Sequence, residues 1–489
     1  MENSFRIFIV SFLFIFMILL TVVQMSNSQM TDTQIQSGQT VFTEEWFNTF
    51  INHINTTFWD SINKGHFIAV DQNANPAITQ KSVIDYDSFI ELYLAMYQKF
   101  NNTIYIERAE SLVSYLHKFL YNNDSYLQIL SESWQPISNS YFSLPYLTKL
   151  LDDYVSLYNV TKNNTYLNEA IKIYNFIYSY FFDKNYWGFF TNLDMNKNPL
   201  NGFGRSPGYY MGFAYNLLHL FEVTNNQTYI VNGLDIINNT ISLAYQDSLG
   251  YFYTFFNGND NTNPVTNYRE YLQMEILSTL LSYLTTDNIN LGSNNSTFTK
   301  IFYNSLHVLE TYGFQNSYVI YSFNQNGNTL DSTEFLSSQI GLLYLYKTMK
   351  ENSWNMTSFE LNVLNKSFDF FVKFYNQKTQ LFFTSTSDST SHFGNNFDAL
   401  RGIINSQQFF SANADYSVFN INGALSSSSV KSEKSTISTS NGESNNSILP
   451  ASSLQTINTT PFDTSFLAFS LVLLVIIKKS TRKNKEKRE

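Results

Sequence analysis

Five acidic residues stand just before or at the start of segments whose apolar spacing predicts helices: Asp85, Asp87, Glu270, Asp331 and Glu334. Charged residues make up only 14% of the chain, so their concentration at these positions is notable. Cleaving a glycosidic bond needs two carboxyl groups about 5 to 9.5 Å apart, and these side chains could supply such a pair. For each acid the alternative is a helix cap or a first-turn charge, which stabilises a helix N-terminus without any catalysis.

Other side chains near the same positions could bind a ligand. The candidate binding residues are Trp134, Arg205, Tyr209, Tyr268, Arg269, His392 and Asp398. The aromatic residues could stack on sugar faces, and the two arginines could hold a carboxylate or phosphate through paired hydrogen bonds. The alternatives are packing at the core or rim for the aromatic residues and structural ion pairs for the arginines.

The composition indicates a protein stabilised by burial and packing. The 489 residues include no cysteine, 34 tyrosines and 45 phenylalanines, so disulfides and thiol chemistry are excluded and aromatic rings carry much of the packing energy. The formal net charge of −10 and the lack of an evident basic face argue against a nucleic-acid partner. No spacing resembles a zinc motif, and we expect no metal and no cofactor.

The N-terminal segment resembles a secretory signal. Arg6 precedes an apolar run over residues 7–23, and small residues follow at Ser26 and Ser28. We assign residues 1–28 to a signal peptide and 29–42 to a lead into the main domain. The alternative is an uncleaved signal anchor, because the apolar run is long for a signal.

The C-terminal segment predicts surface attachment. Residues 421–461 are rich in Ser, Thr and Asn, a composition that favours a stalk over a packed domain. An apolar segment at 462–477 is followed by a basic tail at 478–489, which would stay in the cytoplasm and place the main domain outside the cell. The apolar segment is short for a bilayer, so a processed sorting signal, which weakly resembles archaeal surface-sorting signals, competes with a single-pass anchor.

About a dozen Asn-x-Ser/Thr glycosylation motifs lie in the part of the chain expected to face outward. In a chain this rich in asparagine many of them would arise by chance. Asn101, Asn163 and Asn226 are more telling, because they fall in short turns between predicted helices where a glycan would be tolerated. We therefore expect a glycoprotein.

A phrase recurs about every 60 to 70 residues, which is typical of a repeat architecture. One half of it reads Thr-Tyr-Leu-x-x-Ala or a close variant, at Asn102–Ala109, Asn164–Ala170 and Gln227–Gly233. The other half is an Asp followed by Gly and two aromatic residues, as at Asp183 and Gly188-Phe189-Phe190. Because repeats share one core, we expect one large domain over residues 43–420.

Apolar residues recur at three- and four-residue spacing between these phrases, which predicts helices joined in antiparallel hairpins. The threonines of the repeated phrase, Thr103, Thr165 and Thr228, are predicted N-caps. The first and last helices have no partner next to them in sequence, and pairing them with each other would close a ring. The expected helices cover residues 43–57, 86–100, 103–120, 140–158, 165–182, 208–224, 228–245, 268–284, 297–313, 333–349, 357–376 and 395–411.

This order of phrases resembles the six-hairpin, or (α/α)6-barrel, superfamily of sugar-active proteins, over roughly residues 43 to 411. The pattern of phrases most resembles that of the N-acylglucosamine 2-epimerases and their six-hairpin glycosidase relatives. The resemblance implies an all-α toroid of six helical hairpins, with short Gly-aromatic β-hairpin loops gathered at one end. It also implies that this end is the mouth of the pocket, which is where the candidate residues above would lie.

The sequence departs from the epimerase pattern. Where the family often has Gly-His followed by Glu and Trp, this chain reads Tyr-Arg-Glu-Tyr-Leu from Tyr268. The epimerases are expected to use histidines on inner helices, but only His392 lies at a predicted mouth. Four other histidines fall within predicted helices, where a packing or surface role is favoured. They are His53, His117, His219 and His307.

Three functions remain open on the sequence. The first is a surface-anchored glycoside hydrolase that acts as a monomer on an oligosaccharide or glycan. The second is a non-catalytic platform that binds a glycan or a protein, in which the centre of the toroid would be filled. The third is a sugar epimerase or isomerase, which the histidine pattern disfavours.

Overall fold

A computed structural model describes residues 42–122, 125–200, 204–257, 261, 264–265, 267–287, 289–315, 318–410, 414 and 416–419, without the side chains of Ile84 and Glu270. The chain divides into two compact units, Met1–Lys434 and Ser435–Glu489, and all described residues belong to the first. The expected signal peptide, most of the lead, the stalk, the C-terminal apolar segment and the basic tail lie outside the described residues.

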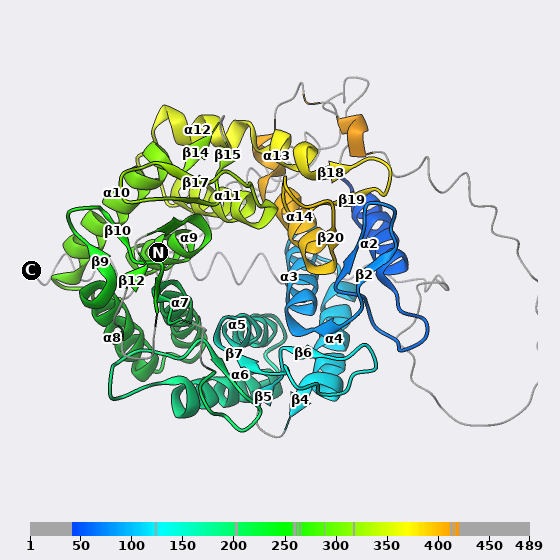
Figure 1. The fold of residues 1–489 in the computed structure, drawn as a ribbon, viewed down its shortest axis with the longest axis horizontal. Helices are drawn as coiled ribbons and strands as arrows, with labels where there is room; N and C mark the ends of the chain where they lie inside the picture. Colours follow the sequence, from blue (N-terminus) through cyan, green and yellow to red (C-terminus); the bar gives the residue numbers. More distant parts are fainter. Residues whose placement is uncertain are drawn as a thin grey trace, which may run out of the picture. The chain divides into compact units, whose positions relative to one another are not determined.

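Six inner helices form a closed ring (Figure 1). Each contacts the next along the chain, and the last contacts the first, so that α14 packs against α3. The predicted ring closure is therefore confirmed. The inner helices are α3 (Val83–Phe100), α5 (Leu144–Thr161), α7 (Pro207–Thr224), α9 (Glu270–Thr285), α11 (Leu336–Glu351) and α14 (Phe393–Ser406).

Outer helices surround this ring, each packed on an inner helix (Figure 1). They are α2 (Glu44–Phe58), α4 (Ile104–Leu120), α6 (Asn164–Phe176), α8 (Gln227–Ala244), α10 (Asn294–Tyr312), α12 (Ser358–Asn365) and α13 (Ser367–Phe374). The first helix, α2, packs on the last, α14, as the sequence predicts. The single helix expected at 357–376 is broken at Lys366 into α12 and α13, and α6 ends in a π-helical turn, Ile177–Phe181.

The inner helices carry apolar residues around most of their surface. In α7, for example, Tyr210, Phe213, Leu217 and Phe221 are all buried. An inner helix contacts two inner neighbours and an outer helix, so only the stripe that faces the ring interior is free to carry polar groups. The core is thus the layer between the two rings, and the polar stripe defines the interior.

Short strands lie in the connections from each outer helix to the next inner helix. The first group is β1 (Ala69–Val70), β2 (Pro76–Ile78), β3 (Lys81–Ser82), β4 (Tyr121–Asn122), β5 (Ser125–Tyr126), β6 (Ile129–Leu130), β7 (Phe142–Ser143), β8 (Asn192–Leu193), β9 (Tyr245–Gln246) and β10 (Tyr251–Phe252). The second is β11 (Phe255–Phe256), β12 (Pro264–Val265), β13 (Tyr268–Arg269), β14 (Phe314–Gln315), β15 (Tyr318–Val319), β16 (Ser322–Phe323), β17 (Thr329–Asp331), β18 (Tyr375–Asn376), β19 (Leu381–Phe382) and β20 (Ser391–His392).

Antiparallel pairing between these strands links neighbouring hairpins. The pairs β3 with β6, β7 with β8, β13 with β16, and β1 with β20 each join the loop before one inner helix to the loop before the next. Isolated bridges complete the circuit between Arg205 and Phe256 and between Phe335 and Ser385. The mouth is therefore a continuous rim that fixes where each inner helix begins.

The helix caps differ in part from the prediction. Asn163 and Asn226 are the N-caps of α6 and α8, and their side chains accept hydrogen bonds from the backbone N–H groups of Thr165 and Thr228. Thr103 is an N-cap without a side-chain bond. The predicted threonine caps at 165 and 228 were wrong because asparagine, two residues earlier, can accept the same kind of bond.

Two apolar segments, at residues 7–23 and 462–477, predict a signal and a membrane or sorting segment, and both lie outside the described residues. Within the part that the structure describes, no helix has the length and apolar character needed to cross a bilayer.

Candidate functional site

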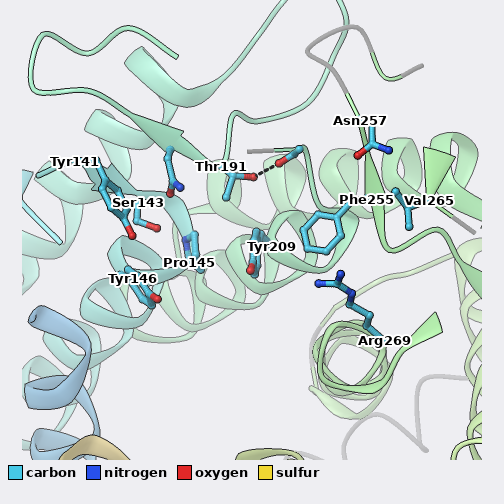
Figure 2. A pocket seen from close by; sticks show the side chains of 12 residues that line it. Tyr141, Ser143, Pro145, Tyr146, Thr191, Tyr209, Phe255, Asn257, Val265 and Arg269 are labelled. Carbon is cyan, nitrogen blue, oxygen red and sulfur yellow. Dashed lines mark hydrogen bonds between the residues drawn. The ribbon is translucent and has the colours of Figure 1, made fainter. Parts of the chain in front are cut away.

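A pocket of ≈ 400 Å³ opens at the rim, where α5, α7 and α9 begin (Figure 2). Tyr146 and Tyr209 occupy the third position of α5 and of α7, and Arg269 immediately precedes α9. Strand pairing of β7 with β8 and of β11 with β12 holds the loops that form its walls. Its lining is Tyr141, Ser143, Pro145, Tyr146, Thr191, Asn192, Gly204, Tyr209, Phe255, Asn257, Val265 and Arg269.

Tyrosine and arginine side chains meet at the inner edge of this pocket. Figure 2 shows Arg269 reaching toward Tyr209, and its guanidinium lies 5.1 Å from the centre of the Phe255 ring and 5.5 Å from that of Tyr321. Tyr271 hydrogen-bonds to both Tyr209 and Arg269. A flat guanidinium beside aromatic faces and hydroxyls is suited to a polyhydroxylated ring, which offers both hydroxyl groups and apolar faces.

Below this edge, Lys149 on α5 carries a positive charge into the ring interior. Its Nζ lies 3.6 Å from Asp87 Oδ2 on α3, and the side chain is 43% exposed. Although burial alone would lower the pKa of Lys149, the carboxylates of Asp87, Asp398 and Glu275 raise it above its usual range. These acids come from three other inner helices, so Lys149 marks the point where the polar stripes of the ring converge.

Asp398 and Glu275 are the water-accessible acids around Lys149. Asp398 Oδ1 accepts a hydrogen bond from Arg401 at 3.2 Å, and burial raises the pKa of Asp398 to about 6, with Lys149 opposing the shift. Surrounding protein also raises the pKa of Glu275, although water reaches its side chain, and Lys149 again opposes the shift. A side chain at Gly212 would collide with Glu275, so glycine at this point of α7 leaves room for the carboxylate.

Asp87 and Asp153 form a buried acid pair between α3 and α5. One oxygen of each carboxyl group lies within 4.8 Å of the other, and among the described residues no donor lies within hydrogen-bonding distance of their oxygens. Two negative charges in this position would repel. Burial and the Asp87 charge raise the pKa of Asp153 well above its usual value.

His219 on α7 pairs with Asp152 on α5. His219 Nδ1 lies 2.5 Å from Asp152 Oδ1, and both side chains are partly exposed. Burial alone would lower the pKa of His219, but the Asp152 carboxylate raises it. The pair is a dyad in which a carboxylate orients an imidazole and raises its pKa, an arrangement used for proton transfer.

Three carboxyl groups could hold a cation: Asp87, Glu91 and Asp153 have ligand oxygens within 4.8 Å of one another. However, Glu91 already forms an ion pair with Arg401, and Asp87 lies beside Lys149. Two cationic side chains of the protein therefore already lie beside these acids.

Two of the predicted catalytic acids lie in this interior. Asp87 belongs to the buried pair, and Asp85, two residues nearer the start of α3, is buried against α14, where its Oδ1 accepts from the backbone N–H of Gly394 at 3.1 Å. Burial, with the charges of Asp398 and Asp87, raises the pKa of Asp85 to about 7. Glu270 is the first residue of α9, but its side chain lies outside the described part of the structure.

The other two predicted acids lie elsewhere. Asp331 is exposed at the end of β17 and accepts from the backbone N–H of Thr333 at 2.8 Å, which is a turn contact. Glu334 forms an ion pair with Lys373 on α13, a helix of the outer ring. We leave both out of the candidate site.

Of the predicted binding residues, Tyr209, Arg269 and Asp398 contribute to the pocket or the interior, whereas Arg205 and Tyr268 are fully buried. Arg205 forms an ion pair with Asp183 and lies over the Phe190 ring, which is a structural role. Tyr268 stacks on Phe323 at 4.2 Å. Both side chains are excluded from a solvent-filled site.

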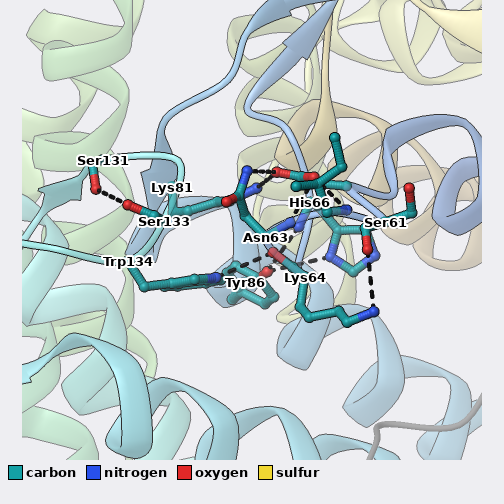
Figure 3. A network of polar contacts seen from close by, with 11 residues as sticks. Ser61, Asn63, Lys64, His66, Lys81, Tyr86, Ser131, Ser133 and Trp134 are labelled. Carbon is teal, nitrogen blue, oxygen red and sulfur yellow. Dashed lines mark hydrogen bonds and ion pairs between the residues drawn. The ribbon is translucent and has the colours of Figure 1, made fainter.

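Trp134 and His392 are also packed into the rim. The Trp134 indole donates to the Lys64 carbonyl at 3.1 Å, and a side chain at Gly65, whose φ is +77°, would collide with its ring. Figure 3 shows Trp134 beside the polar network of Lys81 and His66. His392 lies in β20, paired with Ala69, and burial lowers its pKa. Neither residue faces the pocket.

The interior residues missed on the sequence lie further along the same helix faces. Lys149 and Asp153 follow Tyr146 at three and seven residues, Glu91 follows Asp87 at four, and Arg401 follows Asp398 at three. Helical spacing places such residues on one stripe. The helical spacing could therefore have indicated these residues, but the sequence prediction covered only the start of each inner helix and favoured a packing or surface role for His219.

No family model matches this sequence, and no curated protein sequence matches it. Solved structures with the same fold do exist. A sugar epimerase from a ruminal bacterium is 11% identical, with 74% of this chain and 97% of that one covered, at a TM-score of 0.59. Cellobiose 2-epimerase from Bacillus thermoamylovorans is 14% identical, with coverage of 73% and 99% and a TM-score of 0.58.

An α-1,6-mannanase from a Salegentibacter species is 9% identical, with 75% of this chain and 99% of that one covered, at a TM-score of 0.54. These likenesses show that the chain has the (α/α)6 fold that the sequence predicts. At such identities they show the fold alone.

Proposed function

We propose that this protein is a carbohydrate-active enzyme, and specifically a glycoside hydrolase. The observation that carries the proposal is the convergence of Asp398 and Glu275 on Lys149 in an interior that water reaches. A non-catalytic platform would be expected to have a filled centre. The fold similarity to an α-1,6-mannanase and to sugar epimerases supports a sugar substrate.

Asp398 is the proposed general acid, because a pKa of about 6 lets it hold a proton near neutral pH. It would give that proton to the glycosidic oxygen as the carbon–oxygen bond breaks. Glu275 is the proposed carboxylate partner that takes a proton from the attacking water or stabilises the positive charge on the sugar. Tyr146, Tyr209 and Arg269 would hold the sugar at the mouth.

A second candidate is a sugar epimerase or isomerase, which the His219–Asp152 pair favours. Such an enzyme moves a proton at a carbon atom, and an imidazole held by a carboxylate can accept the proton when neutral and donate one when charged. Similarity to cellobiose 2-epimerase and to a D-mannose isomerase points the same way. The residues around Lys149 would then bind the substrate while His219 acts.

One experiment separates these functions. The full-length protein is incubated in D2O with a panel of gluco- and manno-oligosaccharides of both anomeric linkages, and products are followed by chromatography and NMR. Hydrolysis gives new reducing ends that carry no carbon-bound deuterium, whereas epimerisation incorporates deuterium into an intact sugar. The Asp398→Asn and His219→Gln variants are the matched controls. Neither turnover nor binding of any sugar would contradict both candidates.

We further propose that the enzyme acts outside the cell. The apolar N-terminal segment, the Ser/Thr-rich stalk and the glycosylation motifs support this location. This location can be tested on the cells that make the protein. Protease is added outside the intact cells, which are then fractionated. Protection of the main domain from protease in intact cells would contradict it.

A further inference from the structure

Five consecutive turns between an inner and an outer helix each carry an exposed asparagine in the motif Asn-x-Thr. They are Asn101 between α3 and α4, Asn163 before α6, Asn226 before α8, Asn295 in the first turn of α10 and Asn355 between α11 and α12. The threonine two residues further on is exposed in every case. The motif and its accessibility therefore repeat with the fold.

These turns all lie at the end of the ring opposite the mouth. Each inner helix begins at the rim of short strands and ends at one of these turns, from which the outer helix returns. An inner helix of 18 residues such as α3 separates its two ends by about 27 Å at 1.5 Å per residue. A group attached at these asparagines is therefore far from the pocket.

The loops at the mouth show the opposite pattern. They are rich in asparagine, but among all asparagines in the six connections from outer to inner helices only Asn123 stands in the motif, and that residue lies outside the described part. If the motifs arose from the asparagine content alone, they would be expected in the mouth loops as well as in the turns at the opposite end.

The local geometry accepts modification without loss of structure. Asn163 Oδ1 accepts from the backbone N–H of Thr165 at 3.0 Å, and Asn226 Oδ1 accepts from that of Thr228 at 3.1 Å. N-glycosylation takes place at Nδ2 and leaves Oδ1 in place. A glycosylated asparagine can therefore still cap its helix.

We propose that these five asparagines carry N-linked glycans, and that the glycans cover the face of the ring opposite the mouth. The donor is a lipid-linked oligosaccharide pyrophosphate. The Nδ2 nitrogen forms a bond to the anomeric carbon, the bond from that carbon to pyrophosphate breaks, the amide releases one proton and the lipid pyrophosphate leaves. The mouth stays open to substrate while the opposite face is shielded.

Asn55 provides an internal control. It stands in the same motif but lies within α2, is half-buried, and has a buried Oδ1. A glycan there would have to project from between packed helices. The proposal therefore predicts occupancy at the five turn sites and none at Asn55.

The test uses the full chain purified from the cells that make it. Peptides are treated with an N-glycan amidase in ¹⁸O-water, and each site is scored by mass spectrometry. We expect most copies to be modified at the five turn sites, with Asn55 unmodified. Unmodified turn sites, or glycans on the mouth loops, would overturn the proposal, whatever the enzymatic activity proves to be.

Two variants separate the glycan from the cap. Thr165→Ala destroys the motif but keeps Asn163 and its hydrogen bond, and Asn163→Asp destroys the motif but keeps the Oδ1 acceptor. Both variant proteins are expected to be lighter by the mass of one glycan and to remain folded. If Thr165→Ala leaves the mass of the secreted protein unchanged, Asn163 is not a glycan site.

Discussion

Two regions of the molecule each place a buried carboxyl group beside a lysine, but the pKa of that group is lowered in one region and raised in the other. In the rim, Asp60 contacts Lys81 at 2.9 Å and also accepts from the backbone N–H groups of Ile62 and Asn63 (Figure 3). In the interior, Asp87 and Asp153 lie beside each other, and Lys149 Nζ lies 3.6 Å from Asp87 Oδ2. Donors are abundant in the first region and scarce in the second.

The supply of donors decides the charge. Burial raises the pKa of Asp60, but the hydrogen bonds from Asn63 and Lys81 lower it to about 2, so this acid is ionised at neutral pH. Burial lowers the pKa of Lys81, and its contact with Asp60 opposes that shift. In the interior, burial is not offset, and the pKa of Asp153 rises. Donors in the turns thus stabilise the charged carboxylate of the rim, whereas burial disfavours the charge of the interior acid.

The largest expected effect is on catalysis. Replacing Asp398 with Asn removes the proposed general acid and should lower kcat about 10²- to 10⁴-fold on any substrate the enzyme turns over. The folded structure should be retained, because the amide can still contact its neighbours. Initial rates measure the loss, and Asp331→Asn is the matched control that should keep full activity. Equal losses in both variants would remove the distinction between interior and rim acids.

The next effect is on stability in the rim. Lys81→Met leaves the Asp60 carboxylate buried without its cation and should lower the free energy of unfolding by about 3 to 5 kcal/mol. Chemical denaturation at neutral pH measures the change. The exposed pair of Lys300 and Asp247, at 62% and 71% side-chain exposure, supplies the control, because Lys300→Met should cost less than about 1 kcal/mol. Similar costs would contradict a structural role for the rim pair.

The two acids should also give opposite pH dependences of stability. Asp60 has a lowered pKa, so the stability it contributes is present above about pH 4 and is lost as the pH falls toward 2. Asp153 has a raised pKa, so the folded state holds a proton that the unfolded state releases, and stability falls as the pH rises above about 4.

Asn variants at these two positions measure that difference. From pH 5 to 8, Asp60→Asn should cost a constant 1 to 3 kcal/mol, roughly the value for an impaired buried hydrogen-bond network. Asp153→Asn should instead become less costly, or stabilising, as the pH rises. Thermal unfolding across this pH range tests both. Parallel curves for the two variants would show that the acid pair does not hold a proton.

The smallest expected effect concerns Lys149. Its charge lowers the pKa of Asp398, so Lys149→Met should raise that pKa and move the alkaline limb of the rate profile to higher pH. Lys149→Arg keeps the charge and should restore the original profile. A uniform loss of activity at all pH values would mean that Lys149 acts through packing rather than through charge.

Much of the fold could be predicted because its signals are local. The helical spacing, the Asp-to-Gly turns and the lack of a sequence neighbour for the first and last helices predict six hairpins and a closed ring. The N-caps at Asn163 and Asn226 were missed, because threonine and asparagine can both accept the same bond and stand two residues apart. The break at Lys366 was also missed, since apolar spacing continues across it.

The candidate site was predicted less well. The mouth residues Tyr209 and Arg269 were found, since they stand at helix starts, and so were Asp85, Asp87 and Asp398. Arg205 and Tyr268 stand at equivalent positions along the chain but point into the rim. One residue's difference in register turns a side chain on a short strand from one face to the other, and the sequence does not show which face is buried.

The sequence by itself determined that the chain forms helical hairpins, because hydrophobic periodicity and turn chemistry act within a few residues. It also placed glycosylation motifs in the turns between helices. Only the tertiary structure decided which acids share an environment. Charge and protonation depend on the donors and cations brought from other helices, and Lys149 and Asp153 of α5, Glu275 of α9 and Asp398 of α14 come together only when the ring closes.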